Sequence, residues 1–134
     1  TDVLNQKAYP VSEVKQLLDL ISGFPIPEAG EVQMAEQLNA YGVEAFNKND
    51  FTLAASLFSR ATQANPINIA IWCNLCVARM RVNDHPGAEI AAVQALILSP
   101  YHKDIWEMVR MTCSQNGHSV CQKNAEAVLK ALTP

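Results

Sequence analysis

A repeat of 34 residues constrains this chain more than any other feature of its sequence. The same residue type recurs at this spacing in four pairs: Ala54 and Ala88, Ala61 and Ala95, Pro66 and Pro100, and Trp72 and Trp106. A fixed period of this order indicates stacked copies of one small structural unit. The stretch from Trp72 to Pro100 reads as helix, short turn, helix and proline, so we expect that unit to be a helical hairpin.

Apolar residues at helical spacing predict the two helices of each hairpin. We expect helices over about 33–47, 51–64, 68–81 and 86–98, and a third hairpin that begins near His102 and ends in VCQKNAEAVLKAL. The turns KNDF, VNDH and NGHS fall at equivalent places in the repeat. Asp84 is expected to cap the helix that follows it, and Pro86 suits its first turn. The inner face of helix 33–47 is expected to carry Met34, Leu38, Tyr41 and Ala45.

The N-terminal part of the chain lies outside the repeat. Residues 1–10 are polar and are expected to be frayed. A helix over about 11–22 is predicted from apolar residues at Val11, Val14, Leu17, Leu18 and Ile21. The following GFPIPEAG is a loop, whose Phe24 and Ile26 we expect to pack against the first hairpin. The predicted organisation is an extension over 1–30 and a repeat array over 31–134, with units at about 35–68, 69–102 and 103–134.

Composition excludes several classes of protein. The 134 residues carry a net charge of −3, and no run of basic residues indicates a nucleic-acid partner. No apolar stretch is long enough for a membrane span. Four cysteines in a chain of this size predict a cytoplasmic protein with buried thiols, while a periplasmic or secreted location stays open. The chain begins at Thr1 with a polar stretch, from which we expect a fragment of a longer protein rather than a chain that has lost a signal peptide.

The repeated residues resemble the tetratricopeptide repeat (TPR). The first unit supplies the marker residues Leu38, Tyr41, Gly42, Ala54, Phe58, Ala61 and Pro66. The second supplies Trp72, Leu75, Cys76, Ala88, Ala92, Ala95 and Pro100. The third matches at Trp106 and Val109 and then departs, with Arg110, Gln122 and Glu126 at marker positions. The resemblance implies an all-α superhelix of three TPR-like hairpins preceded by an N-terminal helix, in which Gln122 and Glu126 face water as part of a terminal cap.

The family binds partners in a concave groove lined by the first helix of each hairpin. Transferred to this chain, the groove positions chosen as candidate binding residues are Asn39, Val43, Phe46, Cys73, Val77, Met80, Arg81 and Met111. Arg81 is expected to pair with an acidic group of the partner, and Arg81 and Asn39 to set its register. The alternative is that the N-terminal helix covers part of this groove. Family members that grip acidic C-terminal peptides use basic groove residues, but Asn39, Asp104 and Met108 stand there, so this subclass is not expected.

The cysteines and histidines allow other readings. The letters of Trp72-Cys73-Asn74-Leu75-Cys76 match a thioredoxin-like redox motif, but the motif lies inside a predicted helix at repeat positions, so packed thiols are expected instead. A zinc site from Cys73, Cys76, His118 and Cys121 would draw on two different hairpins, and no metal or other cofactor is expected. A bond between Cys113 and Cys121 stays open. No catalytic motif is present, so no enzyme activity is predicted.

These observations predict a non-catalytic protein–protein interaction module that binds a peptide or a partner helix of unknown identity. One alternative is a homo-oligomerisation domain, in which the third hairpin or the N-terminal helix docks onto a second copy. The other is a regulatory or scaffold segment of a larger protein.

Overall fold

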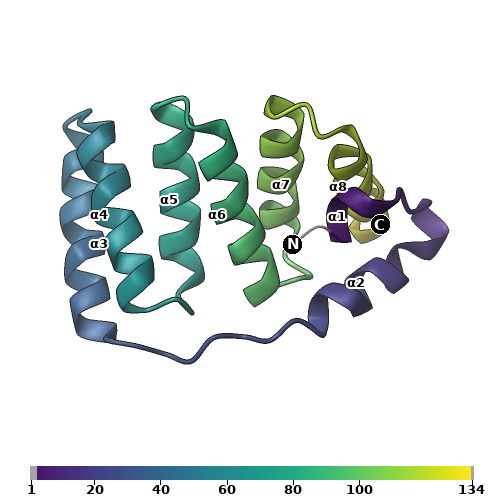
Figure 1. The fold of residues 1–134 in the computed structure, drawn as a ribbon, viewed down its shortest axis with the longest axis horizontal. Helices are drawn as coiled ribbons and strands as arrows, with labels where there is room; N and C mark the ends of the chain where they lie inside the picture. The colour runs from purple at the N-terminus through teal and green to yellow at the C-terminus, as the bar shows by residue number, and fades with distance from the viewer. Residues whose placement is uncertain (1–2, 134) are drawn as a thin grey trace.

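The computed structural model describes residues 3–133, and within this range the regular structure is entirely helical (Figure 1). A short helix and a 3₁₀ turn come first, α1 (Val3–Gln6) and η1 (Val11–Glu13), followed by α2 (Val14–Ser22). Three antiparallel hairpins follow, formed by α3 (Val32–Asn47) with α4 (Phe51–Ala64), α5 (Ile69–Arg81) with α6 (His85–Leu98), and α7 (Lys103–Gln115) with α8 (Ser119–Leu132). The predicted all-α superhelix of three hairpins is therefore confirmed.

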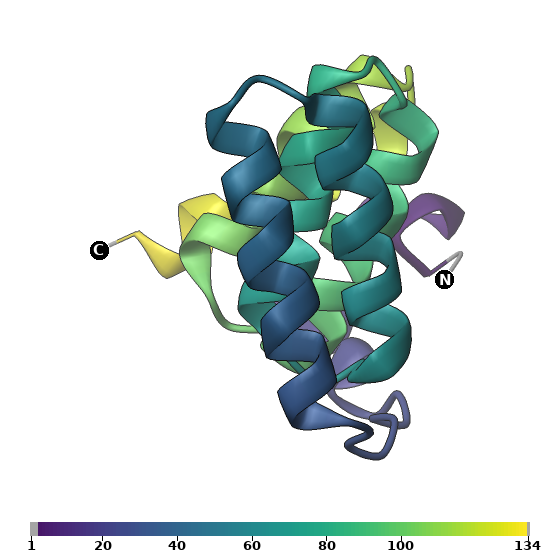
Figure 2. The same cartoon turned by 90° about the vertical axis from the view of Figure 1, so that its left-hand side faces the viewer.

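The hairpins stack because the second helix of each one packs on the first helix of the next. Helix α4 contacts α5, and α6 contacts α7, so the central hairpin is covered on both sides. Figure 2 looks along this stack from the first hairpin, with α3 and α4 nearest the viewer. The small residues at three of the repeat's marker positions, Ala54, Ala88 and Cys76, have no exposed surface.

The three turns share one backbone geometry at the 34-residue spacing. Asn49, Asn83 and Gly117 each take a left-handed conformation, with φ of 63°, 62° and 71°. Asparagine and glycine adopt this conformation more readily than other residues. In the first two turns the next residue is an aspartate that caps the following helix. As predicted, Asp84 accepts a hydrogen bond from the backbone N–H of Gly87 at 3.0 Å.

The two tryptophans tie each hairpin to the one before it. The indole N–H of Trp72 donates to the carbonyl of Pro66 at 2.8 Å, and that of Trp106 donates to the carbonyl of Pro100 at 2.7 Å. Each proline ends one hairpin and each tryptophan lies in the first helix of the next. The proline and the tryptophan that recur in the repeat are therefore hydrogen-bonded to each other at each junction between hairpins.

The N-terminal segment, residues 3–22, packs at the far end of the array. Its elements α1, η1 and α2 contact α8, the last helix in the chain (Figure 1). Its buried side chains are Leu4, Tyr9, Val14, Leu17, Leu18 and Ile21. Residues 3–10 are therefore ordered by packing rather than frayed, and residues 1–2 lie outside the described range. The alternative in which this helix covers the groove is wrong.

Asn124 of α8 fixes the position of the N-terminal segment. Its side chain is fully buried and accepts a hydrogen bond from the backbone N–H of Tyr9 at 2.7 Å. Its amide nitrogen donates to the carbonyls of Leu4 and Lys7, each at 2.9 Å. The prediction that the outer face of α8 is a cap turned to water is therefore corrected, because another part of the chain covers this face. Gln122 is half-buried, whereas Glu126 is exposed.

Two further expectations about apolar side chains are wrong. Ile26 is 61% exposed instead of packing on the first hairpin, although Phe24 is half-buried against the core. Met34 and Tyr41 do not lie on an inner face, since they are 50% and 51% exposed. For Tyr41 the physical reason is that α3 has no preceding hairpin, since the equivalent Leu75 and Val109 on α5 and α7 are fully buried.

Candidate functional site

A row of apolar side chains follows the first helices of the three hairpins. Val43 on α3, Val77 on α5 and Met111 on α7 are equivalent residues, each 34 residues from the next. Their exposed fractions are 39%, 38% and 41%. Exposed large apolar residues repeated at one position mark a surface that is available for contact with another molecule.

A cavity of about 170 Å³ opens between α3 and α5, on the same face as this row. The residues that line it are Val43, Phe46, Phe58, Asn74 and Val77. We call this cavity the apolar well. Val43, Phe46 and Val77 are predicted groove residues. Phe58, which reaches the apolar well from α4, and Asn74 are not among the candidate residues. Its size suits one apolar side chain of a partner rather than a whole small molecule.

Gly42 lets the ring of Phe58 reach the apolar well. A Cβ atom at position 42 would lie 2.5 Å from the Phe58 ring, which is closer than packed atoms approach. The ring is itself 2% exposed. The sequence signal for this contact is a glycine at a small-residue marker position together with a phenylalanine in the second helix of the same hairpin.

Asn39 and Asn74 form a polar edge beside the apolar well. The side-chain amide of Asn74 donates to the side-chain carbonyl of Asn39 at 3.0 Å. The bond leaves one N–H₂ group on Asn39 and one carbonyl on Asn74 with further bonding capacity. An amide pair of this kind has the donor and the acceptor that a peptide main chain requires.

Arg81 lies over two aromatic rings at the end of α5. Its guanidinium carbon is 5.5 Å from the centroid of the Phe46 ring and 5.1 Å from that of Phe51. The two rings themselves meet edge to face at 4.9 Å. Such contacts restrain a long side chain and leave its charge in water. Arg81 is therefore held in place while it remains exposed at one end of the groove.

The other predicted residues lie apart from the apolar well. Cys73 and Met80 are half-buried and pack against the core. Met111 lies on the third hairpin, where Arg110 is paired with Glu107. The structure therefore brings together Asn39, Val43, Phe46, Val77 and Arg81 on the first two hairpins.

The two free thiols are poorly suited to redox chemistry. Burial raises the pKa of the Cys73 thiol above its usual value, and burial raises the pKa of the Cys76 thiol to about 12. A thiol with a raised pKa holds little of the reactive thiolate near neutral pH. The structure therefore supports the reading of this CxxC sequence as packed thiols.

The other two cysteines form a disulfide between α7 and α8. Cys113 and Cys121 are bonded with their Cα atoms 5.9 Å apart, which answers a question that the sequence left open. Cys121 is thereby removed from the zinc ligands considered above. Over residues 3–133 no cluster of three or more His, Cys, Asp or Glu side chains is suited to hold a metal ion.

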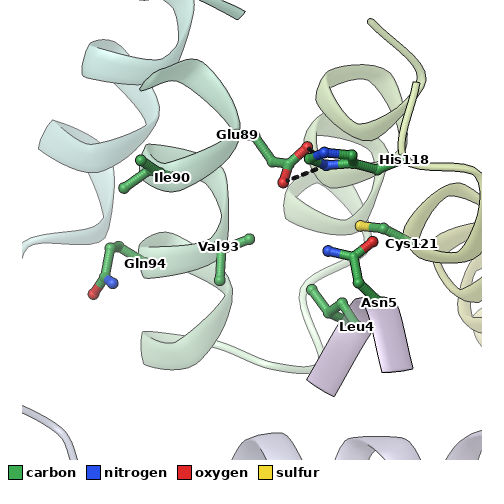
Figure 3. Close-up of a pocket in the computed structure, with 8 residues that line it drawn as sticks. All are labelled: Leu4, Asn5, Glu89, Ile90, Val93, Gln94, His118 and Cys121. Atoms are coloured by element: carbon green, nitrogen blue, oxygen red, sulfur yellow. Dashed lines mark hydrogen bonds and ion pairs between the residues drawn. The ribbon is translucent and has the colours of Figure 1, made fainter. Parts of the chain in front are cut away.

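A second cavity of about 190 Å³ lies where the N-terminal segment meets α6 and α8 (Figure 3). Leu4 and Asn5 form one wall, and Glu89 and His118 lie at its polar end. The Glu89 carboxylate is 2.8 Å from Nδ1 of His118 and accepts a hydrogen bond from the side chain of Asn116 at 3.0 Å. This cavity exists only because the N-terminal segment is docked beside α8.

Within the described part of the chain, no helix is both long enough and apolar enough to cross a bilayer.

Comparison with solved structures shows the same architecture in other proteins. The first TPR of Spaghetti (RPAP3), bound to the HSP90 peptide SRMEEVD, aligns with a TM-score of 0.68 at 20% identity, covering 81% of this chain and 86% of that one. The Sgt2 TPR domain from Aspergillus fumigatus aligns with a TM-score of 0.64 at 18% identity, covering 81% and 72%. MamA aligns with a TM-score of 0.64 at 15% identity, covering 91% and 64%.

No protein-family model matches the sequence, and no curated protein matches it either. The likeness therefore rests on the arrangement of helices, and at these identities it establishes the fold alone. The marker residues of the repeat, the stacked hairpins and the structural neighbours agree, and this chain has the fold of a tetratricopeptide-repeat domain.

Proposed function

We propose that this chain is a non-catalytic protein-interaction module that binds a peptide or a partner helix in its concave groove. The observation that carries the proposal is the apolar well, because it collects exposed apolar side chains from two hairpins around one opening. A partner side chain that entered it would be removed from water, which favours binding by about 25 cal/mol per Å² of apolar surface. The peptide-bound RPAP3 structure supports the proposal by analogy of fold only.

The groove favours a partner that is not strongly acidic. The family resemblance also turns Glu36, Asp104 and Glu107 toward the groove, so that it carries three carboxylates and one cation, Arg81. Glu107 is paired with Arg110, so the remaining balance of the groove is still slightly negative. A peptide with several carboxylates would meet like charge at these positions. We therefore propose a neutral or basic peptide with one apolar side chain for the apolar well.

The proposal predicts that Val77→Glu weakens peptide binding. Peptides would be selected from a phage-displayed library on the wild-type chain, and their Kd measured by fluorescence anisotropy. A buried carboxylate in the apolar well should weaken binding at least tenfold, because it must be desolvated without a partner. The acidic peptide SRMEEVD is expected to bind at least tenfold more weakly than the selected peptides.

Leu20→Glu is the matched control, since Leu20 is 49% exposed on α2 and lies outside the groove. It makes the same change in charge and polarity, and binding should stay within about twofold of wild type. Circular dichroism should show both variants fully helical. Equal affinity of wild type and Val77→Glu for the selected peptides would reject the groove as the binding surface.

The disulfide also indicates the type of cell compartment in which the protein is located. Disulfides persist in oxidising compartments and are rare in the cytosol. We infer that the Cys113–Cys121 bond favours a periplasmic or secreted location over the cytoplasmic one expected from the cysteine content. The redox state of these two cysteines in freshly lysed, alkylated cells tests this, because a fully reduced pair would favour the cytoplasm.

A further inference from the structure

The N-terminal segment contacts the rest of the molecule mainly through one helix. Its elements α1, η1 and α2 all pack on α8, and Asn124 of α8 makes three hydrogen bonds to its backbone. Six buried apolar side chains of the segment complete the contact. Any copy of the chain whose segment is detached would leave both this apolar surface and Asn124 open to water.

The linker that joins the segment to the first hairpin, residues 25–30, is not packed. All six residues are exposed, and residues 25–29 make no hydrogen bond in the part of the chain that the structure describes. The linker is attached at its end, where the backbone N–H of Glu31 donates to the carbonyl of Ala64 at 2.7 Å. Detaching the linker from its present path would therefore break few interactions.

The linker must also be stretched to let the segment reach α8 of its own chain. Figure 1 shows it running along the lower edge of the array, from the end of α2 beside the third hairpin to the start of α3 in the first. Six residues reach at most about 22 Å. A flexible chain of this length has a root-mean-square span of only about 12–15 Å. A linker that has to be extended lowers the effective concentration of the segment at its own docking face.

We propose that the N-terminal segment is exchanged between two copies of this chain, so that α8 of each copy is covered by α1, η1 and α2 of the other. The contacts in the exchanged dimer are those already present within one chain, and only the direction of the linker differs. Exchange of an identical element is a low-cost route to a dimer. Pro25 and Pro27 keep the linker extended, which suits a chain that crosses between copies. The exchange does not depend on the proposed groove, but it would place two grooves in one bivalent assembly.

The mass of the wild-type chain in solution, measured by light scattering over a range of concentrations, tests the proposal. The dimer fraction should rise with protein concentration. A variant lacking Pro25, Ile26 and Pro27 should be dimeric at all concentrations, because its shortened linker no longer reaches its own α8. A variant with six Gly and Ser residues inserted after Pro27 should need at least tenfold more protein to dimerise.

Backbone amide NMR shifts distinguish exchange from other dimers. Exchange should change shifts in and beside the linker and leave those of α8 and the groove unaltered. A dimer that shifts Val43, Val77 or the outer face of α3 would contradict the proposal. So would a wild-type chain that stays monomeric at its highest soluble concentration, or a shortened variant that stays monomeric with the α8 shifts of the wild type.

Discussion

Cys76 illustrates how a single residue serves packing in this chain. It occupies the small-residue position that Gly42 holds in the first hairpin, and it has no exposed surface. Burial raises the pKa of its thiol to about 12, from an ordinary value of 9.0. The folded state therefore keeps the proton in a pH range where the unfolded state loses it. The free energy of unfolding must therefore fall as pH rises above about 9.

This difference predicts an effect of Cys76→Ala on alkaline stability. Between pH 9 and 12, proton loss stabilises the unfolded wild-type chain by up to about 1.4 kcal/mol per pH unit. The free energy of unfolding of the wild type, measured with urea, should therefore fall by about 1 kcal/mol more than that of the variant between pH 8 and pH 10. Alanine is the residue that the repeat favours here, so the fold should be kept. Parallel pH profiles for the two proteins would contradict the raised pKa.

Residues also show where the sequence predicted the site well and where it did not. Val43, Val77 and Phe46, which the family resemblance suggested as groove residues, lie around the apolar well. Phe58 was missed because it belongs to a second helix, and it reaches the groove side only through the gap left by Gly42. Arg81 was expected to be free for a partner, but contacts with two rings that a linear sequence does not pair now restrain it.

At the scale of elements, the third hairpin differs from the other two. Its second helix begins after His118, which makes no side-chain cap, whereas the equivalent Asp50 and Asp84 both cap. The disulfide between Cys113 and Cys121 spans the turn of this hairpin. The covalent bond replaces local stabilisation that the other turns obtain from aspartate.

Reduction of this disulfide should destabilise the domain. A bond that closes a loop with a sequence separation of 8 contributes about 2–3 kcal/mol in the chain-entropy model. The midpoint of urea unfolding should accordingly fall when a reducing agent is added. Alkylation of the urea-unfolded chain followed by mass spectrometry provides the control, with two of the four cysteines modified before reduction and all four after it. Four modified cysteines without reductant would show that the bond is absent.

The hairpins themselves could be predicted closely because their information is local. Helix boundaries differ from expectation by about one residue, as at Val32 and His85, since caps and turn residues determine them. The place of the N-terminal helix could not be predicted, because amphipathic periodicity shows that a helix has a buried face but not which surface covers it. The buried Asn124 was the available signal, but its partners are backbone groups more than a hundred residues away.

At the scale of the whole molecule, the two ends of the array are finished in different ways. Ile71 and Ile105 are buried in the later hairpins. The equivalent residue on α3 is Gln37, which is exposed and donates a hydrogen bond to the hydroxyl of Tyr41. This end is therefore polar at Gln37, although the ring of Tyr41 beside it is 51% exposed. The other end is apolar and is covered by the N-terminal segment. The buried side chains of the N-terminal segment belong to the same apolar core as those of the hairpins.

Asn124→Ala tests how strongly the segment is held. The variant leaves the N–H of Tyr9 and the carbonyls of Leu4 and Lys7 without their partner in a buried contact. Each buried group left unbonded costs about 1–3 kcal/mol, so the free energy of unfolding should fall by about 3 kcal/mol or more. Gln122→Ala, on the same helix, is the control and should cost less than about 1 kcal/mol. A loss below 1 kcal/mol for Asn124→Ala would show that the segment is only loosely attached.

The contact between Tyr9 and Asn124 also sets the order in which the protein can fold. Contacts within and between hairpins join residues that are close in sequence, and such contacts form rapidly. The contact of Tyr9 with Asn124 joins residues 115 positions apart. During synthesis residues 3–22 are made well before α8 and must therefore wait for it, with six apolar side chains unprotected meanwhile. Docking of the N-terminal segment on α8, rather than formation of the repeats, is the step that closes the native structure.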